Sequence, residues 1–198
     1  RGCHFYPTTA HLSARAMRVL GCIIAGGKST RMGRDKALIE WRGKALILHV
    51  IDRLEPQVDR LVINANSAHL DLGFQVISDR IDTGTPLAGL HAALHFASVN
   101  GFDAVITAPC DSPLLPHDLR TRLQGPNAAI AASAGQAHYL TGFWPVAVLS
   151  QFIAHKFSRV ADFVAATQAR QVEWQVEGHD PFVNLNTPED LVALSEKT

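Results

Sequence analysis

The stretch from Val19 to Lys36 reads VLGCIIAGGKSTRMGRDK, and it decides the fold. Its first six residues, Val19–Ile24, form an apolar run that predicts a buried strand. The residues that follow predict an anion-binding loop, because two adjacent glycines let backbone N–H groups turn inward around a phosphate. Arg31 and Lys36 add positive charge that can meet phosphate directly. We therefore expect a strand that ends in a phosphate-binding loop.

The rest of the chain continues this alternation of short strands and helices. Apolar runs bounded by Gly, Pro, Asn or Asp predict strands over Arg60–Ala65, Phe74–Ser78, Asp103–Ala108 and Asn127–Ser133, and a more aromatic one over His138–Pro145. Apolar residues at helical spacing predict two helices, one with a face of Leu46, Val50, Ile51 and Leu54, the other with a face of Leu87, Leu90, Leu94 and Ala97. Pro116 and Pro188 suit the first turns of two further helices. This pattern predicts an α/β fold of three α/β/α layers, with a Rossmann-like, mostly parallel sheet.

The charge of the chain is balanced overall but uneven along the sequence. Its 198 residues include 18 Lys+Arg and 18 Asp+Glu, which gives a net charge of zero. This excludes a broad nucleic-acid or anionic-membrane binding surface, which needs a basic excess. No apolar run reaches the ~18–20 residues that span a bilayer. Residues 28–44 nevertheless hold six basic residues against two acidic ones, which favours a focused phosphate site.

The length predicts one domain, which we assign to residues 17–198. Residues 1–16, RGCHFYPTTAHLSARA, precede Met17, lack the apolar core of a secretory signal, and look like a leader or tag. Cys3, Cys22 and Cys110 are widely spaced without a C-x-x-C pair. This excludes a disulfide framework or a zinc ribbon and favours a reducing, cytoplasmic setting.

Polar residues follow three of the predicted strands, where open parallel sheets bind their ligands. Asn64 offers a donor and an acceptor, Asp79 offers a carboxylate, and the carboxylate of Asp111 suits Mg²⁺ bound together with phosphates. Two of them have a structural alternative, since Asn64 could form a turn and Asp111 an Asx turn or a helix cap. The loop after Ile24 fits neither G-x-G-x-x-G nor G-x-x-x-x-G-K-[ST], so these two nucleotide-binding templates are not supported.

Several motifs together resemble the molybdenum cofactor guanylyltransferases. They are G-G-K-S-T-R-M-G-R-D-K over residues 26–36, T-P-L-A-G over 85–89, C-D-S-P over 110–113 and F-V-N-L-N-T-P-E-D-L over 182–191. The resemblance extends from about Val19 to Leu194. Two departures stand out, since Thr85 replaces a usual glycine and no basic residues precede His138.

The resemblance implies a sheet of the nucleotidyltransferase type and an Mg²⁺-dependent enzyme. That enzyme transfers GMP from GTP to the terminal phosphate of molybdopterin and releases pyrophosphate. The implied nucleotide contacts are Ile24, Ala25, Gly26, Gly27, Lys36, Asn64, Asp79 and Asp111, with Arg31, Lys36 and Asp111 as catalytic residues and Asp111 as the metal ligand. The implied acceptor contacts are Arg159, Asn184 and Asn186, and His138–Pro145 is expected to border the acceptor site.

Other functions remain open at this stage. The first is transfer of CMP from CTP to the same pterin, or another small-molecule nucleotidyl transfer. A different class is a GTP-binding or cofactor-carrier protein without catalysis. We expect a monomer that contacts cofactor-delivery or molybdoenzyme partners transiently, and no nucleic acid or membrane partner.

Overall fold

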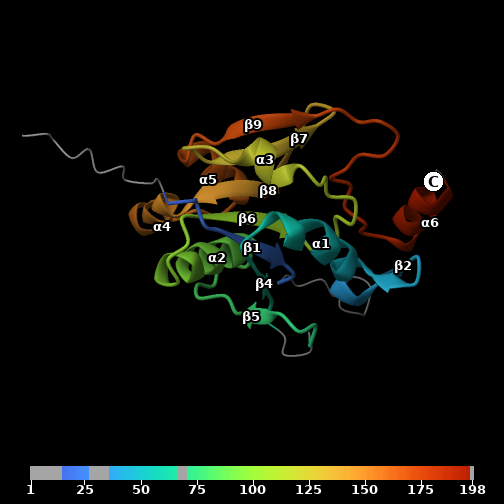
Figure 1. Ribbon diagram of the computed structural model, residues 1–198, viewed down its shortest axis with the longest axis horizontal. Helices are drawn as coiled ribbons and strands as arrows, with labels where there is room; N and C mark the ends of the chain where they lie inside the picture. Colours follow the sequence, from blue (N-terminus) through green and yellow to red (C-terminus); the bar gives the residue numbers. More distant parts are fainter. Residues whose placement is uncertain (1–14, 27–35, 67–70, 197–198) are drawn as a thin grey trace, which may run out of the picture.

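The computed structural model describes residues 15–26, 36–66 and 71–196. Strands and helices alternate along most of this part of the chain (Figure 1). The strands are β1 Val19–Ile24, β2 Glu40–Trp41, β3 Lys44–Ala45, β4 Arg60–Asn64, β5 Gln75–Ile77, β6 Ala104–Pro109, β7 Ala129–Ser133, β8 Gln136–Pro145 and β9 Arg170–Trp174. The α-helices are α1 Leu46–Leu54, α2 Leu87–Val99, α3 Leu119–Leu123, α4 Leu149–Ala154, α5 Val160–Ala166 and α6 Pro188–Glu196.

The main sheet has the strand order β5-β4-β1-β6-β8-β7-β9 (Figure 1). All six residues of β1 are buried, as its apolar sequence predicts. β1 lies parallel to β4 on one side and to β6 on the other, with Ile24 opposite Asn64 and Pro109. After β1 the chain thus forms β4 on one side of that strand, and later it forms β6 on the other side. Such a switch in strand order opens a crevice at the carboxyl ends of the strands.

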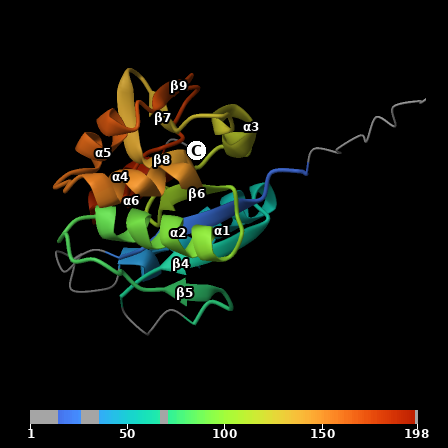
Figure 2. The same cartoon turned by 90° about the vertical axis from the view of Figure 1, so that its left-hand side faces the viewer.

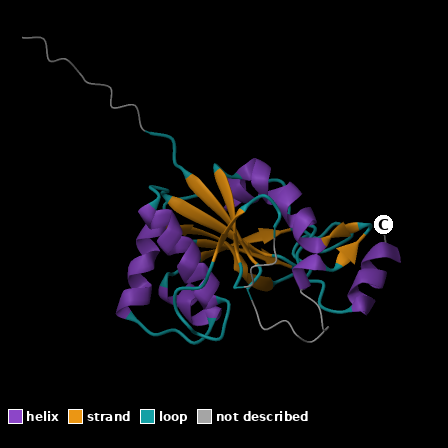
Figure 3. Cartoon of the chain, turned by 90° about the horizontal axis from the view of Figure 1, so that it is seen from below, coloured by secondary structure: helices purple, strands orange, loops and turns teal. Residues whose placement is uncertain are grey.

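Helices cover both faces of the sheet, which confirms the expected three layers (Figure 3). One face packs against α1 and α3 through residues such as Ile47 and Leu119. The other packs against α2, α4 and α5 through residues such as Leu90 and Phe163, and Figure 2 looks onto this side. A smaller apolar cluster joins α6 to the β2–β3 hairpin. No helix among the described residues is long and apolar enough to cross a membrane.

The sheet is mostly parallel, as expected, and β8 runs antiparallel to its neighbours β6 and β7. Other expectations need correction. The helix expected to open at Pro116 begins at Leu119, after a turn. The sequence did not predict α4, α5, β9 or the β2–β3 hairpin. Of the segment expected to be a leader, residues 1–14 lie outside the described part, while Arg15 contacts the fold through the Gly101 carbonyl at 3.1 Å.

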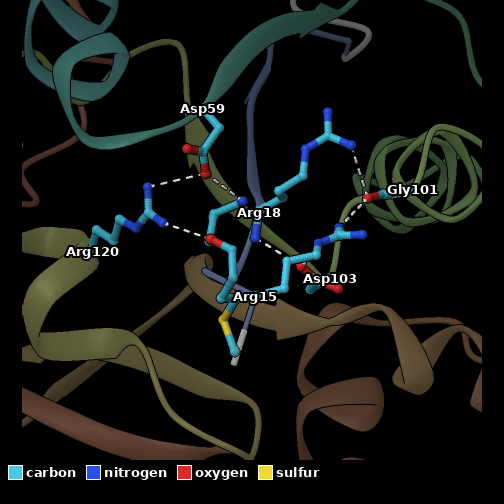
Figure 4. Close-up of polar contacts among 8 residues, drawn as sticks. Arg15, Arg18, Asp59, Gly101, Asp103 and Arg120 are labelled. Carbon is cyan, nitrogen blue, oxygen red and sulfur yellow. Dashed lines mark hydrogen bonds and ion pairs between the residues drawn. The ribbon is translucent and has the colours of Figure 1, made fainter. Parts of the chain in front are cut away.

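Two carboxylates accept hydrogen bonds from the backbone at the amino-terminal end of β1 (Figure 4). This end of the strand is opposite the crevice. Asp103 accepts a hydrogen bond from the Arg18 backbone N–H at 2.7 Å, and Asp59 accepts one from the Val19 N–H at 2.7 Å. The guanidinium of Arg120 pairs with Asp59 at 3.2 Å. The buried start of the central strand therefore keeps its hydrogen-bonding capacity satisfied.

Candidate active site

The loop predicted to bind phosphate leaves the sheet at its central strand. Beyond β1, the Ala25 N–H donates to the Asn64 carbonyl at 2.8 Å, and the Cys110 N–H donates to the Ile24 carbonyl at 3.1 Å. These bonds hold the first residues of the loop between β4 and β6. Gly27 and Arg31, two predicted site residues, lie outside the described residues. The loop returns at Lys36, which begins a short 3₁₀ turn.

Lys36 joins three segments that are far apart in the sequence. Its ammonium group bonds to the Asp111 carboxylate, which follows β6, and to the Asn186 side-chain oxygen, which precedes α6. The Lys36 and Asp111 side chains keep only 14% and 13% of their surface exposed, so solvent screens this ion pair weakly. The structure thus brings three predicted site residues into one cluster, which we call the Lys36–Asp111–Asn186 cluster.

The surroundings of Asp111 fit a divalent cation. One carboxylate oxygen pairs with Lys36, while the other, Oδ1, is buried and has no hydrogen-bond partner. An unpartnered buried carboxylate oxygen is costly unless a ligand meets it. Among the described residues, no group of three or more His, Cys, Asp or Glu side chains could hold a metal. A bound cation would therefore take its remaining ligands from water and substrate, as Mg²⁺ does with phosphates.

The side chain of Asn64 holds the carboxylate of Asp79 in place by hydrogen bonding. Its side-chain N–H₂ donates to Asp79 at 2.9 Å and to the Ile77 carbonyl at 3.2 Å, and the whole residue is fully buried. Asn66 supports the other Asp79 oxygen at 2.7 Å and accepts the Asp79 N–H at 3.0 Å. The expected direct contact between Asn64 and the nucleotide stays a prediction. In this structure Asn64 positions Asp79 through the hydrogen bond that its amide donates.

Two glycines make room for the Asn64 amide. A Cβ atom on Gly89 would lie 2.2 Å from the Asn64 side-chain oxygen, and one on Gly26 would lie 3.2 Å from it. This close approach explains the glycine that ends T-P-L-A-G. Thr85, which replaces the usual glycine at its start, is not among the residues with positive φ and bonds through its hydroxyl to Thr83 at 3.0 Å. Its backbone therefore does not require glycine.

A cavity of about 470 Å³ lies beside the Lys36–Asp111–Asn186 cluster. Its lining includes Asp111, Ser112, His138, Arg159 and Asn184, together with residues 139–141 of β8. Ser112 donates a hydrogen bond to the side-chain oxygen of Asn184 at 2.7 Å. The structure thus places two predicted acceptor contacts, Arg159 and Asn184, in one pocket, with the third, Asn186, on Lys36. Residues of β8 line this cavity, while its role as the acceptor site stays a prediction.

Arg159 stands at the open side of this cavity, ahead of α5. Its guanidinium forms an ion pair with Asp162 at 2.7 Å, and 76% of its side chain is exposed. The hydrogen bond between them raises the pKa of Arg159 and lowers the pKa of Asp162. The guanidinium is therefore a fixed positive charge at the entrance to the pocket.

The segment before α6 carries the two asparagines in alternation. Leu185 is buried and donates its N–H to the Asp111 carbonyl at 3.0 Å, while Asn184 and Asn186 on either side are exposed. The same segment caps α6. The Asp190 N–H donates to the Thr187 hydroxyl at 3.2 Å, and the Thr187 N–H donates to the Asp190 carboxylate at 2.9 Å.

Two groups that support the site were not predicted from the sequence. One is Asn66, whose position after the strand end Asn64 signals it only weakly. The other is the side-chain cluster of Ser133, His138 and Asp180, of which His138 lines the pocket. A polar last residue in an otherwise apolar strand was the available signal for Ser133.

Comparison with known proteins agrees with this geometry. Residues 21–175 match the family described as MobA-like NTP transferase domain. The chain belongs to this family. A molybdenum cofactor guanylyltransferase of Cereibacter sphaeroides is 42% identical over 185 residues, covering 88% of this chain and 94% of that protein. Another from Rhodopseudomonas palustris is 40% identical over 186 residues, covering 85% and 89%.

The fold of MobA-like transferases is also found among solved structures. Molybdopterin-guanine dinucleotide biosynthesis protein A of Archaeoglobus fulgidus superposes with a TM-score of 0.65 at 20% identity, covering 89% of this chain and 97% of that one. The MobA-like match includes Lys36, Asp111 and Arg159, whereas Asn184 and Asn186 lie after its end.

Proposed function

We propose that this chain transfers GMP from GTP to the terminal phosphate of molybdopterin, forming a guanine dinucleotide cofactor and pyrophosphate. The similarity to molybdenum cofactor guanylyltransferases supports this choice of substrates. The observation that carries the proposal is the Lys36–Asp111–Asn186 cluster, which joins the end of the phosphate loop to the cavity lined by Arg159 and Asn184. A nucleotide held by the loop and an acceptor held in the cavity would meet at this cluster.

The reaction needs positioning and charge neutralisation more than proton transfer. An oxygen of the acceptor phosphate forms a bond to the α-phosphorus of GTP while the bond to pyrophosphate breaks. That oxygen is already anionic at neutral pH, so no general base is required. Lys36 binds the triphosphate and offsets its growing charge from a fixed position. Asp111 would hold Mg²⁺, which supplies further positive charge to the phosphate oxygens when bound.

The Asp79 carboxylate is suited to recognise guanine. Guanine presents N–H donors at N1 and N2, which a carboxylate can accept, whereas adenine presents an acceptor at N1. The two hydrogen bonds from Asn64 and Asn66 fix the orientation of this carboxylate. Rigid placement of an acceptor is what a selective base site requires.

We further propose that the enzyme acts as a monomer in the cytoplasm, with transient contacts to cofactor-delivery or molybdoenzyme partners. Cys22 is a buried thiol outside any disulfide, which suits a reducing compartment. Burial raises the pKa of this thiol to about 12, so it is inert as a nucleophile.

The test compares GTP, CTP and ATP as donors to molybdopterin in the presence of Mg²⁺, with product identified by mass spectrometry. We expect product from GTP, and a kcat lowered about 10²-fold or more in Lys36→Ala and Asp111→Asn. Asp52→Asn is the matched carboxylate control, because Asp52 is 60% exposed and pairs with Lys44 on the surface. A preference for CTP would reassign the donor. GTP binding without pyrophosphate release would favour a carrier instead.

A further inference from the structure

A shift in strand pairing turns part of β8 toward the cavity. β7 and β8 form a hairpin whose turn residues, Ala134 and Gly135, have φ angles of 48° and 74°. The register then shifts, because Ala131 lies opposite His138 while the preceding Ile130 lies opposite Gly142. The three residues in between, 139–141, have no partners on β7, and they line the cavity together with His138.

His138 is anchored through one ring nitrogen. Its Nε2 lies 2.6 Å from the hydroxyl of Ser133, which is fully buried and lies 2.8 Å from the Asp180 carboxylate. A serine hydroxyl has a single hydrogen, and a carboxylate can only accept. Ser133 therefore donates to Asp180 and must accept from His138. This fixes the tautomer, with the hydrogen of the imidazole on Nε2.

The other ring nitrogen, Nδ1, is left as an acceptor. Burial lowers the pKa of His138, although Asp180 and Glu173 oppose this effect, so the ring is neutral near pH 7. Nδ1 has no hydrogen-bond partner in the described part of the chain. The two nitrogens of an imidazole point in roughly opposite directions, so anchoring Nε2 to the buried serine leaves Nδ1 for a ligand.

Aromatic packing also fixes the plane of the His138 ring. Phe182 packs on the imidazole with centroids 4.8 Å apart and planes at 34°, and Trp174 supports Phe182 edge-on at 5.2 Å. The Phe182 N–H donates to the same Asp180 oxygen at 2.8 Å. An acceptor locked in this way loses little conformational entropy on binding a ligand.

We propose that His138 determines the specificity of the acceptor pocket by accepting, through Nδ1, a hydrogen bond from an N–H group of the pterin ring. Ser133 is then a positioning residue that selects the tautomer. The ligand identity rests on the proposed function, whereas the tautomer does not. A neutral acceptor suits a heterocyclic N–H and gives nothing to a phosphate oxygen, which needs donors.

The tautomer is tested on the full chain by nitrogen NMR of the histidine rings at pH 7.5, without any substrate. We expect His138 to show a protonated Nε2 and an unprotonated Nδ1. We expect Ser133→Ala to give a mixture of both tautomers. A protonated Nδ1 in the unaltered chain would overturn the proposal.

Ligand recognition is tested with two probes, 6-hydroxymethylpterin followed by fluorescence and inorganic pyrophosphate followed by calorimetry. His138→Phe keeps the ring that packs on Phe182 but removes Nδ1, so pterin affinity should fall about tenfold. His138→Asn keeps an acceptor near the same place and should recover part of this loss. The exposed His117 provides the matched control, His117→Phe, which should leave pterin affinity unchanged.

The outcomes separate this inference from the proposed function. If His138→Phe raises the KM for molybdopterin and leaves the KM for GTP unchanged, the specificity role is supported. Unchanged pterin affinity, or a loss confined to pyrophosphate, would overturn it while GMP transfer still stands. Absence of GMP transfer in the unaltered chain would refute the proposed function, and the pterin affinities would still decide the role of His138.

Discussion

Gly89→Ala probes how α2 supports the nucleotide side of the site. The added Cβ would lie 2.2 Å from the side-chain oxygen and 3.0 Å from the side-chain carbon of Asn64, and 3.2 Å from the Ile24 side chain. Asn64 cannot yield easily, because it is fully buried and two hydrogen bonds hold its amide. Relief of the clash must move this amide away from Asp79 or move α2 away from the sheet.

The magnitude follows from three contributions. Overpacking a filled site costs about 1–3 kcal/mol, and the hydrogen bond to the Asp79 carboxylate is worth about 1.5–3 kcal/mol if it breaks. These are alternative responses to one clash, so they are not summed. Alanine in place of glycine inside a helix returns about 1 kcal/mol. We expect a net destabilisation of up to about 2 kcal/mol, with weaker GTP binding if the Asn64 amide moves.

Urea denaturation gives the free energy of unfolding, and calorimetry gives the GTP affinity. Gly125→Ala is the control, because a Cβ there meets nothing nearer than an Arg170 nitrogen at 3.8 Å. In the Asn64→Ala background the clash is gone, so Gly89→Ala should become neutral or stabilising. Equal destabilisation by Gly89→Ala with and without Asn64 would refute this reasoning.

Three further predictions concern stability. Asp59→Ala should lower the free energy of unfolding by about 1–3 kcal/mol, because it leaves the buried Val19 N–H without its acceptor and Arg120 without its partner. Urea denaturation measures this loss, with Asp59→Asn, which keeps an acceptor, as the comparison. Thr187→Ala should cost about 1 kcal/mol by removing the cap of α6, and an unchanged urea midpoint would contradict that role. Hydrogen bonds from backbone N–H groups lower the pKa of Asp190, so its contribution is complete above the ordinary carboxyl range and is lost as pH falls through the lowered pKa. Thermal unfolding between pH 6 and about pH 2 should therefore show an acid loss that is smaller in Asp190→Asn.

The sequence predicted the parts of the fold that depend on burial alone. Val19–Ile24 is apolar throughout and is a central strand with the predicted bounds. Asp111 follows another buried strand, and the parallel sheet brings it to the same edge as Ile24. Leu46, Val50, Ile51 and Leu54 are all buried, as their spacing predicts. The last three pack against the sheet, and Leu46 lies in the smaller cluster with Trp41. In each case the local pattern and the tertiary contact agree.

The remaining features depend on contacts between distant segments. Arg170–Trp174 is a strand at the edge of the sheet, where Arg170, Gln171 and Glu173 are exposed, so its sequence holds no apolar run. The contact of Asn64 with the nucleotide stays a prediction. Its hydrogen bond to Asp79 was not predicted, because it depends on the β4–β5 register, which places Asn64 opposite Ile77. No sequence pattern reports such a register.

Transfer of a labelled phosphate tests the central claim most directly. GTP labelled at the α-phosphate is incubated with the chain, Mg²⁺ and molybdopterin, and the products are separated. The account predicts that the label enters the pterin dinucleotide in a one-to-one ratio with pyrophosphate, and that Asp111→Asn abolishes both products together. Label found in free GMP, or a dinucleotide still formed at the full rate by Asp111→Asn, would contradict it.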